Sequence, residues 1–168
     1  ESIRKFCPSA YLHVTVDDYK DLSYVHDICK DFSYNYYLID IDIVQLFCAK
    51  IPIERSPFIF NHYINIAMPF IKDAWCMVLD DDDELVSKPY FEEKETDTIY
   101  LSRTEIEGRI IPSDINFGKN IEFKDISTLC VIFHSSQFVE WTPQRGGDYQ
   151  FIKDLHEKCT TVWLDKIT

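Results

Sequence analysis

The chain has 168 residues, of which 46% are hydrophobic and 15% aromatic, and it carries a formal net charge of −12 at pH 7. This composition excludes a disordered chain, and the length favours a single domain with a sizeable core. The negative charge leaves no basic stripe that would neutralise a phosphate backbone, so we expect no nucleic-acid partner. Only four glycines occur, and neither a GxGxxG nor a GxxxxGK[ST] phosphate loop is present.

The hydrophobic pattern alternates between strand and helix periods in the first half of the chain, while strands dominate the middle. The predicted elements are the end of a helix at 1–7, a strand at 10–18, a helix at 19–33, a strand beginning near residue 36, a helix at 57–74, a strand at 75–79, a short helix around 87–95, strands at 97–103, 109–112 and 128–136, a helix at 147–159 and a strand at 160–165. This order predicts an α/β sandwich with a mostly parallel central sheet, flanking helices and some antiparallel additions.

The six cysteines form no CxxC pair, and Cys29, Cys76 and Cys130 fall within apolar patterns. That placement is typical of reduced core cysteines rather than of a disulfide framework. We therefore expect a reducing compartment, namely the cytoplasm. No apolar run approaches the roughly 18 residues of a membrane-spanning helix and no signal peptide is visible, so we expect no membrane span.

Four consecutive aspartates, Asp80–Asp83, directly follow the expected strand at 75–79. Carboxylates about 6 Å apart repel each other by roughly 3 kcal/mol at an effective dielectric of about 20, so solvent or a cation must offset the repulsion. Residues two apart in a strand face the same side, which lets Asp80 and Asp82 act together. Oxygen ligands beyond the carboxyl end of a strand suit Mg²⁺ or Mn²⁺. A metal site and a solvated acidic loop both remain open at this point.

Two enzyme classes place an Asp-x-Asp motif after an apolar strand. Haloacid-dehalogenase-type phosphatases place it after the first strand of their core and follow it with Thr or Val. Here Glu84 takes that position, and at least two expected strands precede the cluster. Glycosyltransferases place the motif in mid-chain, after a nucleotide-binding half, and this order fits the sequence better.

Three blocks of the sequence resemble GT-A glycosyltransferases, most closely the family 2 type. Residues 1–18 (ESIRKFCPSAYLHVTVDD) resemble that family's first helix and second strand, and residues 60–91 resemble its block of helix, strand and Asp-x-Asp motif. Residues 144–155 (QRGGDYQFIKDL) resemble its GxDxxhhxxh block, in which h is hydrophobic. The family's first strand and following loop are absent, and we expect them to lie outside this sequence.

The resemblance implies a GT-A (Rossmann-like) fold in one catalytic domain over residues 1–168, with a nucleotide-binding half at about 1–83 and an acceptor-side half at about 84–168. It implies metal-dependent transfer of a sugar from a nucleoside-diphosphate sugar, with uridine diphosphate as the commonest carrier. The acceptor would be a hydroxyl of a glycan, a protein or a small molecule, and a single displacement would invert the anomeric configuration.

The resemblance also implies roles for individual aspartates. Asp17 and Asp18 match positions that contact the nucleotide base. Asp80 and Asp81 fall where the family binds the donor, and Asp80 and Asp82 match the ligands of Mn²⁺ or Mg²⁺.

Further candidates lie outside the acidic cluster. Asp148 matches the family's catalytic base, although an aspartate that opens a helix is equally an ordinary N-cap. His134 is a candidate third metal ligand, the alternative being a strand-end histidine bonded to solvent or backbone. Asn61 and Asn65 lie four apart on the expected helix, so one of them is a candidate for the donor site. Trp141 suits either a sugar-stacking surface or the core.

Two other functions fit the same acidic cluster. One is a Mg²⁺-dependent phosphatase or a nucleotidyltransferase, although nucleotidyltransferases normally begin with a glycine-rich loop that this sequence lacks. The other is a domain without catalytic activity that binds cations.

Overall fold

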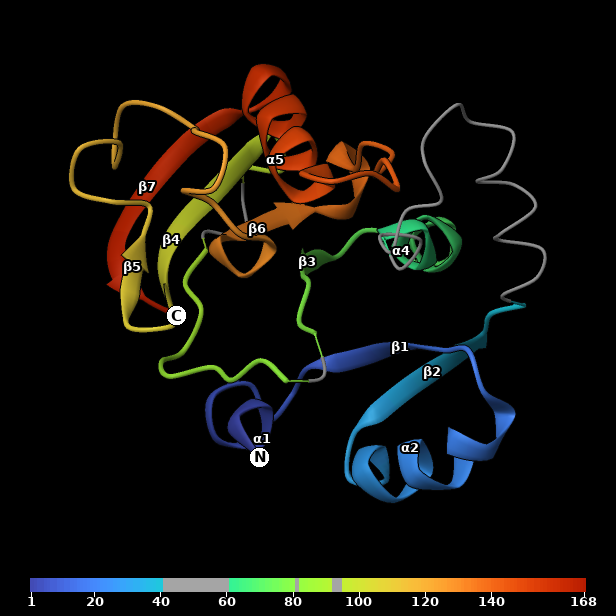
Figure 1. Cartoon of the computed structure of the whole chain (residues 1–168). Coiled ribbons are helices and arrows are strands. Elements are labelled where there is room, and N and C mark those ends of the chain that lie inside the picture. Colours follow the sequence, from blue (N-terminus) through green and yellow to red (C-terminus); the bar gives the residue numbers. More distant parts are fainter. Residues whose placement is uncertain (41–60, 81, 92–94) are drawn as a thin grey trace.

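The structure, a computed structural model, describes residues 1–40, 61–80, 82–91 and 95–168 (Figure 1). Its helices are α1 (Ser2–Phe6), α2 (Leu22–Cys29), α4 (Asn61–Ala67) and α5 (Gly147–Lys158), and its strands are β1 (Tyr11–Val16), β2 (Ser33–Leu38), β3 (Trp75–Met77), β4 (Thr98–Ile106), β5 (Arg109–Ile111), β6 (Val131–His134) and β7 (Thr160–Ile167). Short 3₁₀ turns cover Tyr19–Asp21, Met68–Phe70, Thr128–Cys130 and Ser135–Gln137. The start of the helix expected from residue 57 onward lies outside the described residues.

The first sheet consists of β1 and β2, which run parallel from the pair Tyr11 and Ser33 to the pair Val16 and Leu38. The helix α2 makes the crossover between them, as a parallel pair requires. The helix α4 packs against β1, and the Tyr63 hydroxyl donates to Asp17 Oδ2 at 3.0 Å. Because both strands point the same way, their carboxyl ends lie side by side, next to α4.

The second sheet has the strand order β3-β6-β4-β5, and β7 pairs with β4 as well. The pairs β3–β6, β4–β6 and β4–β5 are antiparallel, and β4–β7 is parallel. The turn between β4 and β5 consists of Glu107 and Gly108, whose φ angles are 51° and 76°. Two residues with positive φ are typical of the tight turn that joins antiparallel strands.

The expected Rossmann-like GT-A sandwich with a mostly parallel central sheet is therefore wrong. The described residues form a two-stranded parallel sheet and a mostly antiparallel five-stranded sheet. A parallel connection needs a crossover of about a dozen residues or more, and the Glu107–Gly108 turn is far too short for one. The short helix expected around 87–95 is also wrong for its described residues, which are not helical. The bond Lys88–Pro89 disfavours the helical conformation at Lys88.

The main core lies between α5 and the strands β4 and β6. In α5, Phe151, Ile152 and Leu155 follow the helical spacing and are at most 1% exposed. They pack in one cluster with residues of β4 and β6, among them Leu101 and Phe133. Complete burial of each such side chain stabilises the fold by about 1.5–3 kcal/mol. The predicted strand at 97–103 and the predicted helix at 147–159 are confirmed. The strand predicted at 128–136 is confirmed only for Val131–His134, because 3₁₀ turns flank it on both sides.

The cysteines of the described residues are unpaired thiols, of which Cys29 and Cys130 are buried. Burial raises the pKa of Cys130 to about 12 and that of Cys76 to about 11. Cys29, Cys76 and Cys130 therefore fit the interpretation of reduced core cysteines. Cys48 lies outside the described residues. Within the described ranges, no helix is long and apolar enough to cross a membrane.

The loop between β5 and β6 is closed by the carboxylate of Asp125. It accepts from the Ser113 hydroxyl at 2.8 Å, from the Asn116 amide at 2.7 Å and from the Ser113 backbone N–H at 3.1 Å. Burial alone would raise the pKa of Asp125, but these hydrogen bonds and the Arg109 charge outweigh it, and the pKa is lowered. A lowered pKa in the folded state means that the ionised carboxylate stabilises the fold.

The variant Asp125→Asn should lower the free energy of unfolding by about 1–3 kcal/mol at neutral pH, because hydrogen bonds to an ionised acceptor are lost. The wild-type advantage is present above the unfolded-state pKa and disappears as the pH falls through the lower folded-state pKa. Urea unfolding of both proteins over a pH series measures this difference. Asp114→Asn, at an exposed partner of Arg103, serves as the control and should cost less than about 1 kcal/mol. A difference between wild type and Asp125→Asn that stays constant down to acidic pH would contradict the assignment.

Candidate functional site

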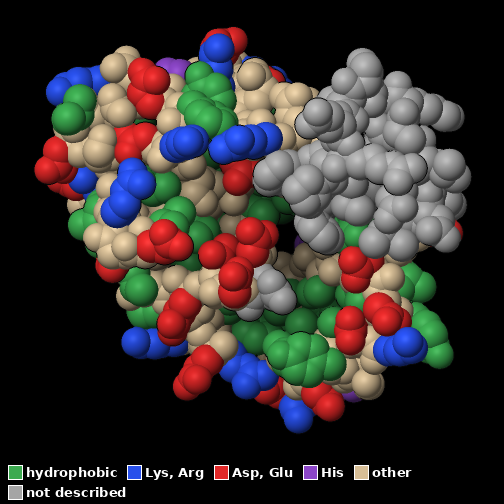
Figure 2. Space-filling model, in the orientation of Figure 1, with side chains coloured by type: hydrophobic (Ala, Val, Ile, Leu, Met, Phe, Trp, Pro, Cys, Tyr) green, Lys and Arg blue, Asp and Glu red, His purple; other side chains and the backbone are tan. Residues whose placement is uncertain are grey.

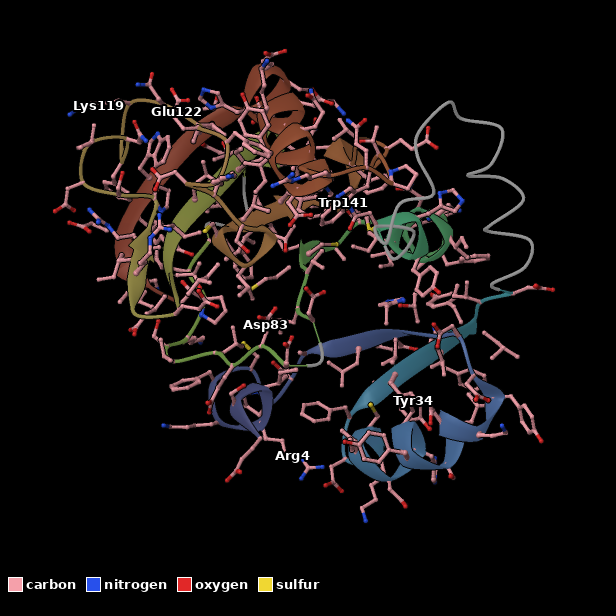
Figure 3. The ribbon with its side chains drawn as sticks, in the orientation of Figure 1. Arg4, Tyr34, Asp83, Lys119, Glu122 and Trp141 are labelled. Atoms are coloured by element: carbon pink, nitrogen blue, oxygen red, sulfur yellow. The ribbon has the colours of Figure 1, made fainter. Side chains whose placement is uncertain are left out.

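The acidic segment begins two residues after β3, with Val78 and Leu79 between them, and closes into a turn. The Asp80 backbone N–H donates to Asp83 Oδ2 at 2.8 Å, and the Asp83 N–H donates to the Asp80 carbonyl at 3.2 Å. Asp80 and Asp82 are exposed, and Asp81 lies outside the described residues. Figure 3 shows Asp83 on the segment that leads from β3 toward α1, where the Leu85 N–H donates to Ser2 Oγ at 3.1 Å.

His134 lies at the other end of β3 from the acidic segment. It pairs with Trp75, the first residue of β3, because β6 runs antiparallel to that strand. The five steps along the chain from Trp75 to Asp80 span roughly 16 Å when the chain is extended. The His134 Nε2 lies 3.5 Å from Asp73 Oδ1, and its Nδ1 lies 2.7 Å from Ser136 Oγ. The structure thus gives His134 partners of its own and does not bring it to the aspartates.

The donor atoms of the acidic segment fit a hard divalent cation only in part. Asp80 and Asp82 offer exposed carboxylate oxygens, which are the ligands that Mg²⁺ and Mn²⁺ prefer. Within the described ranges, no group of three or more His, Cys, Asp or Glu side chains converges on one point. A cation held here would therefore need phosphate oxygens of a substrate and water to complete its shell.

A hollow of about 340 Å³ lies at the carboxyl ends of β1 and β2. Its lining residues are Asp17, Asp18, Tyr19, Leu38, Ile39 and Asp40. Burial raises the pKa of Tyr63 to about 12, with the hydrogen bond to Asp17 acting in the same direction. Tyr63 therefore stays a hydrogen-bond donor and fixes that carboxylate. The sequence did not single out Tyr63, because only the packing of α4 on β1 connects it to Asp17.

This hollow and the acidic segment lie at different ends of β1. The hollow follows the last residue of that strand, whereas the segment after β3 contacts α1, which precedes the strand. Figure 1 shows β1 apart from the larger sheet, and Figure 2 shows acidic side chains at several separate places on the visible face. The structure therefore does not gather the predicted donor-binding aspartates around a single point.

Asp148 lies in the first turn of α5, where Gly146, with a φ of 77°, takes the N-cap position. The alternative that Asp148 is itself the N-cap is therefore wrong. The carboxyl is half-buried, and burial raises its pKa above the ordinary value. The indole N–H of Trp141 and the backbone N–H of Asp148 lower the pKa but do not outweigh burial. A carboxylate with a raised pKa is a better proton acceptor than an exposed one.

The segment before α5 is bound to α4 by two asparagines. Asn65 Nδ2 donates to the Trp141 carbonyl at 2.8 Å, and the Trp141 N–H donates to Asn65 Oδ1 at 2.8 Å. Asn61 Nδ2 donates to the Thr142 carbonyl at 3.4 Å. The expectation that one of these asparagines points at a donor gives way to a different role, since both bind the backbone that leads into the Asp148 helix.

Trp141 belongs to the core and is not an exposed stacking surface. It is 2% exposed, and its ring stacks on Phe151 with a centroid distance of 4.4 Å and an interplanar angle of 5°. Its Nε1 and the nearby Thr142 Oγ1 are buried without a hydrogen-bond partner among the described residues. A buried donor without a hydrogen-bond partner costs about 1–3 kcal/mol of stability, so an unpaired indole N–H at this position requires an explanation.

Gly147 permits this close arrangement because it has no side chain. A Cβ at this position would overlap the Thr142 carbonyl oxygen and the Asn61 amide nitrogen, and it would lie 3.0 Å from Trp141 Nε1. The first turn of α5 thus packs directly on α4 and on the indole.

Comparison of the chain with protein-family models, with curated proteins and with solved structures finds no match. The chemistry of the site is therefore argued from these contacts.

The variant Gly147→Ala should destabilise the protein by about 3 kcal/mol, since the added methyl overlaps a backbone carbonyl that has no room to move. Gly118→Ala is the matched control, because Gly118 has a φ of 75° and open space around it. The control should lose only about 1–2 kcal/mol through backbone strain. Urea unfolding of both variants makes the comparison, and equal stabilities would contradict the close packing at Gly147.

Proposed function

We propose that this chain is a glycosyltransferase that moves a sugar from a nucleoside-diphosphate sugar to an acceptor hydroxyl, with Asp148 as the catalytic base. The observation that carries the proposal is the half-buried Asp148 carboxyl, whose pKa is raised in the first turn of α5. The resemblance of the block around this residue to family 2 glycosyltransferases supports the same role. The proposal concerns the reaction and does not require a mostly parallel sheet.

The proposed reaction is a single displacement. As the acceptor oxygen attacks the anomeric carbon, its proton passes to the Asp148 carboxylate. The new carbon–oxygen bond forms while the bond to the diphosphate breaks, and the nucleoside diphosphate leaves with the electron pair. Attack opposite the leaving group inverts the anomeric configuration. General-base catalysis of this kind contributes typically 10²–10⁴-fold to the rate.

Two separate acidic regions are the candidates for donor binding, and each offers a different chemistry. The hollow bounded by Asp17, Asp18 and Tyr19 offers carboxylates for nucleoside hydroxyl or amino groups and an exposed ring for stacking. Asp80 and Asp82 are the residues that would hold Mn²⁺ or Mg²⁺. When bound, such an ion would offset the charge that develops on the diphosphate.

A second candidate is a domain without catalytic activity that binds cations. The exposed carboxylates of Asp80 and Asp82 favour it, because they offer oxygen ligands to a cation from solvent. The two hydrogen bonds between Asp80 and Asp83 hold this turn without a substrate. This candidate leaves the raised pKa of Asp148 without a role.

Thermal unfolding with a panel of nucleotide sugars, with and without Mn²⁺, tests the proposal. We expect at least one nucleotide sugar to raise the Tm of the wild type only when Mn²⁺ is present, and Asp82→Ala to abolish that shift. Asp148→Asn should retain the shift but lose at least about 10²-fold of the transfer rate. Glu105→Gln, which removes an exposed charge on β4, is the control and should behave as wild type.

Three outcomes would contradict the proposal. No stabilisation by any nucleotide sugar, with Asp82→Ala indistinguishable from wild type, would favour the second candidate. Release of phosphate from a simple phosphomonoester would favour a phosphatase instead. Full transfer activity in Asp148→Asn would exclude Asp148 as the base.

A further inference from the structure

The indole N–H of Trp141 is held in one orientation from two sides. The backbone of Trp141 is fixed by the paired hydrogen bonds to Asn65, both 2.8 Å long. Its ring lies flat against Phe151, which is on α5 three residues after Asp148. Rotation of the ring would break this stacking inside a closely packed core, so the direction of the N–H is set by the fold.

The indole N–H points toward the first turn of α5. A Cβ on Gly147 would lie 3.0 Å from Nε1, so the indole nitrogen lies against the residue that precedes Asp148. The nitrogen is close enough to Asp148 to lower the pKa of its carboxyl, yet it makes no hydrogen bond of ordinary geometry in the described residues. Hydrogen bonds at catalytic groups are often long without substrate and shorten in the complex.

We propose that Trp141 is a positioning residue that acts through Asp148, its indole N–H donating a hydrogen bond to the carboxylate when the acceptor is bound. The bond would leave the second carboxylate oxygen to receive the acceptor proton and would hold the ionised form in place. The part of the inference that concerns transfer rests on the proposed function. The interaction between the indole and the carboxylate does not.

Among the groups that shift the pKa of the Asp148 carboxyl, the Trp141 indole is the one side chain that a substitution can remove. Burial, the Trp141 N–H and the backbone N–H of Asp148 are the causes of its shift. No titratable side chain on the elements around it is among those causes. These side chains include Glu140 and Arg145 before α5, Tyr149, Lys153 and Asp154 on α5, and His62 and Tyr63 on α4. Loss of the indole N–H should therefore change the titration of Asp148 without a competing charge to mask it.

The test is the titration of the Asp148 carboxyl, followed by carbon NMR in wild type and in Trp141→Phe. We expect the pKa of Asp148 to be higher in the variant, because a donor to the ionised form is lost. Trp163→Phe, which removes an indole on β7 that packs against Phe117, is the matched control and should leave this pKa unchanged. The acidic limb of the transfer activity should shift to higher pH in Trp141→Phe only. A lower stability with an unchanged Asp148 pKa would show a purely structural role and overturn the inference.

A second measurement decides the matter even if Trp141→Phe fails to fold. In the wild type, the Nε1–H resonance of Trp141 should shift with pH along the titration curve of Asp148, and Asp148→Asn should abolish that shift. A resonance that stays constant while Asp148 titrates would overturn the inference. If the coupled titration is seen but no nucleotide sugar supports transfer, the proposed function fails while the Trp141–Asp148 interaction stands.

Discussion

The two hydrogen bonds between the Asn65 side chain and the Trp141 backbone are the constraint on which the candidate site depends. They join α4, which packs on the two-stranded sheet, to the segment that leads into α5, which packs on the five-stranded sheet. An amide side chain offers one donor and one acceptor side by side, so it pairs with a backbone N–H and C=O at once. If the side chain were lost, both Trp141 groups would need new partners, at a cost of about 1–3 kcal/mol for each that stays buried and unpaired.

The same helix also reaches the other candidate site. Residues four apart share one face of a helix, so Asn61 and Asn65 both face the Trp141–Thr142 segment. Tyr63 lies halfway between them in the chain and faces the other way, where its hydroxyl binds Asp17. The two-turn helix α4 thus binds the Asp17 carboxylate after β1 and also the Trp141 backbone, which leads into the helix that carries Asp148. This arrangement gives a physical reason for a polar pattern on a helix that is otherwise apolar.

The sequence predicted those features that depend on local pattern. The spacing of Phe151, Ile152 and Leu155 predicts the helix and its buried face, and the apolar runs predict most of the strands. The pairing direction of β3, β4, β5 and β6 in the larger sheet was predicted wrongly, because a short apolar run looks the same in parallel and antiparallel sheets. The same error placed His134 near Asp80 and Asp82, whereas in the antiparallel pairing His134 lies opposite Trp75 at the start of β3.

The environment of Asp148 depends on residues far away in the chain. Its position in a helix that begins near residue 147 follows from the sequence, but its burial depends on α4, Trp141 and the absence of a side chain at Gly147. The spacing of Asn61 and Asn65 was the one available signal, since two amides four apart on an apolar helix need partners. The sequence could not identify those partners, because they are backbone groups about 76 to 81 residues further along the chain.

Hydrogen exchange at the Trp141 backbone amide tests the central constraint most directly. In the wild type this amide should exchange as slowly as the core amides of Ile99 and Leu101, because Trp141 is buried and its N–H donates to the Asn65 side chain. In Asn65→Ala it should exchange much faster, while the amides of Ile99 and Leu101 keep their protection. An amide at Trp141 that exchanges at the rate of an unstructured peptide in the wild type, or that is equally protected in Asn65→Ala, would contradict this account.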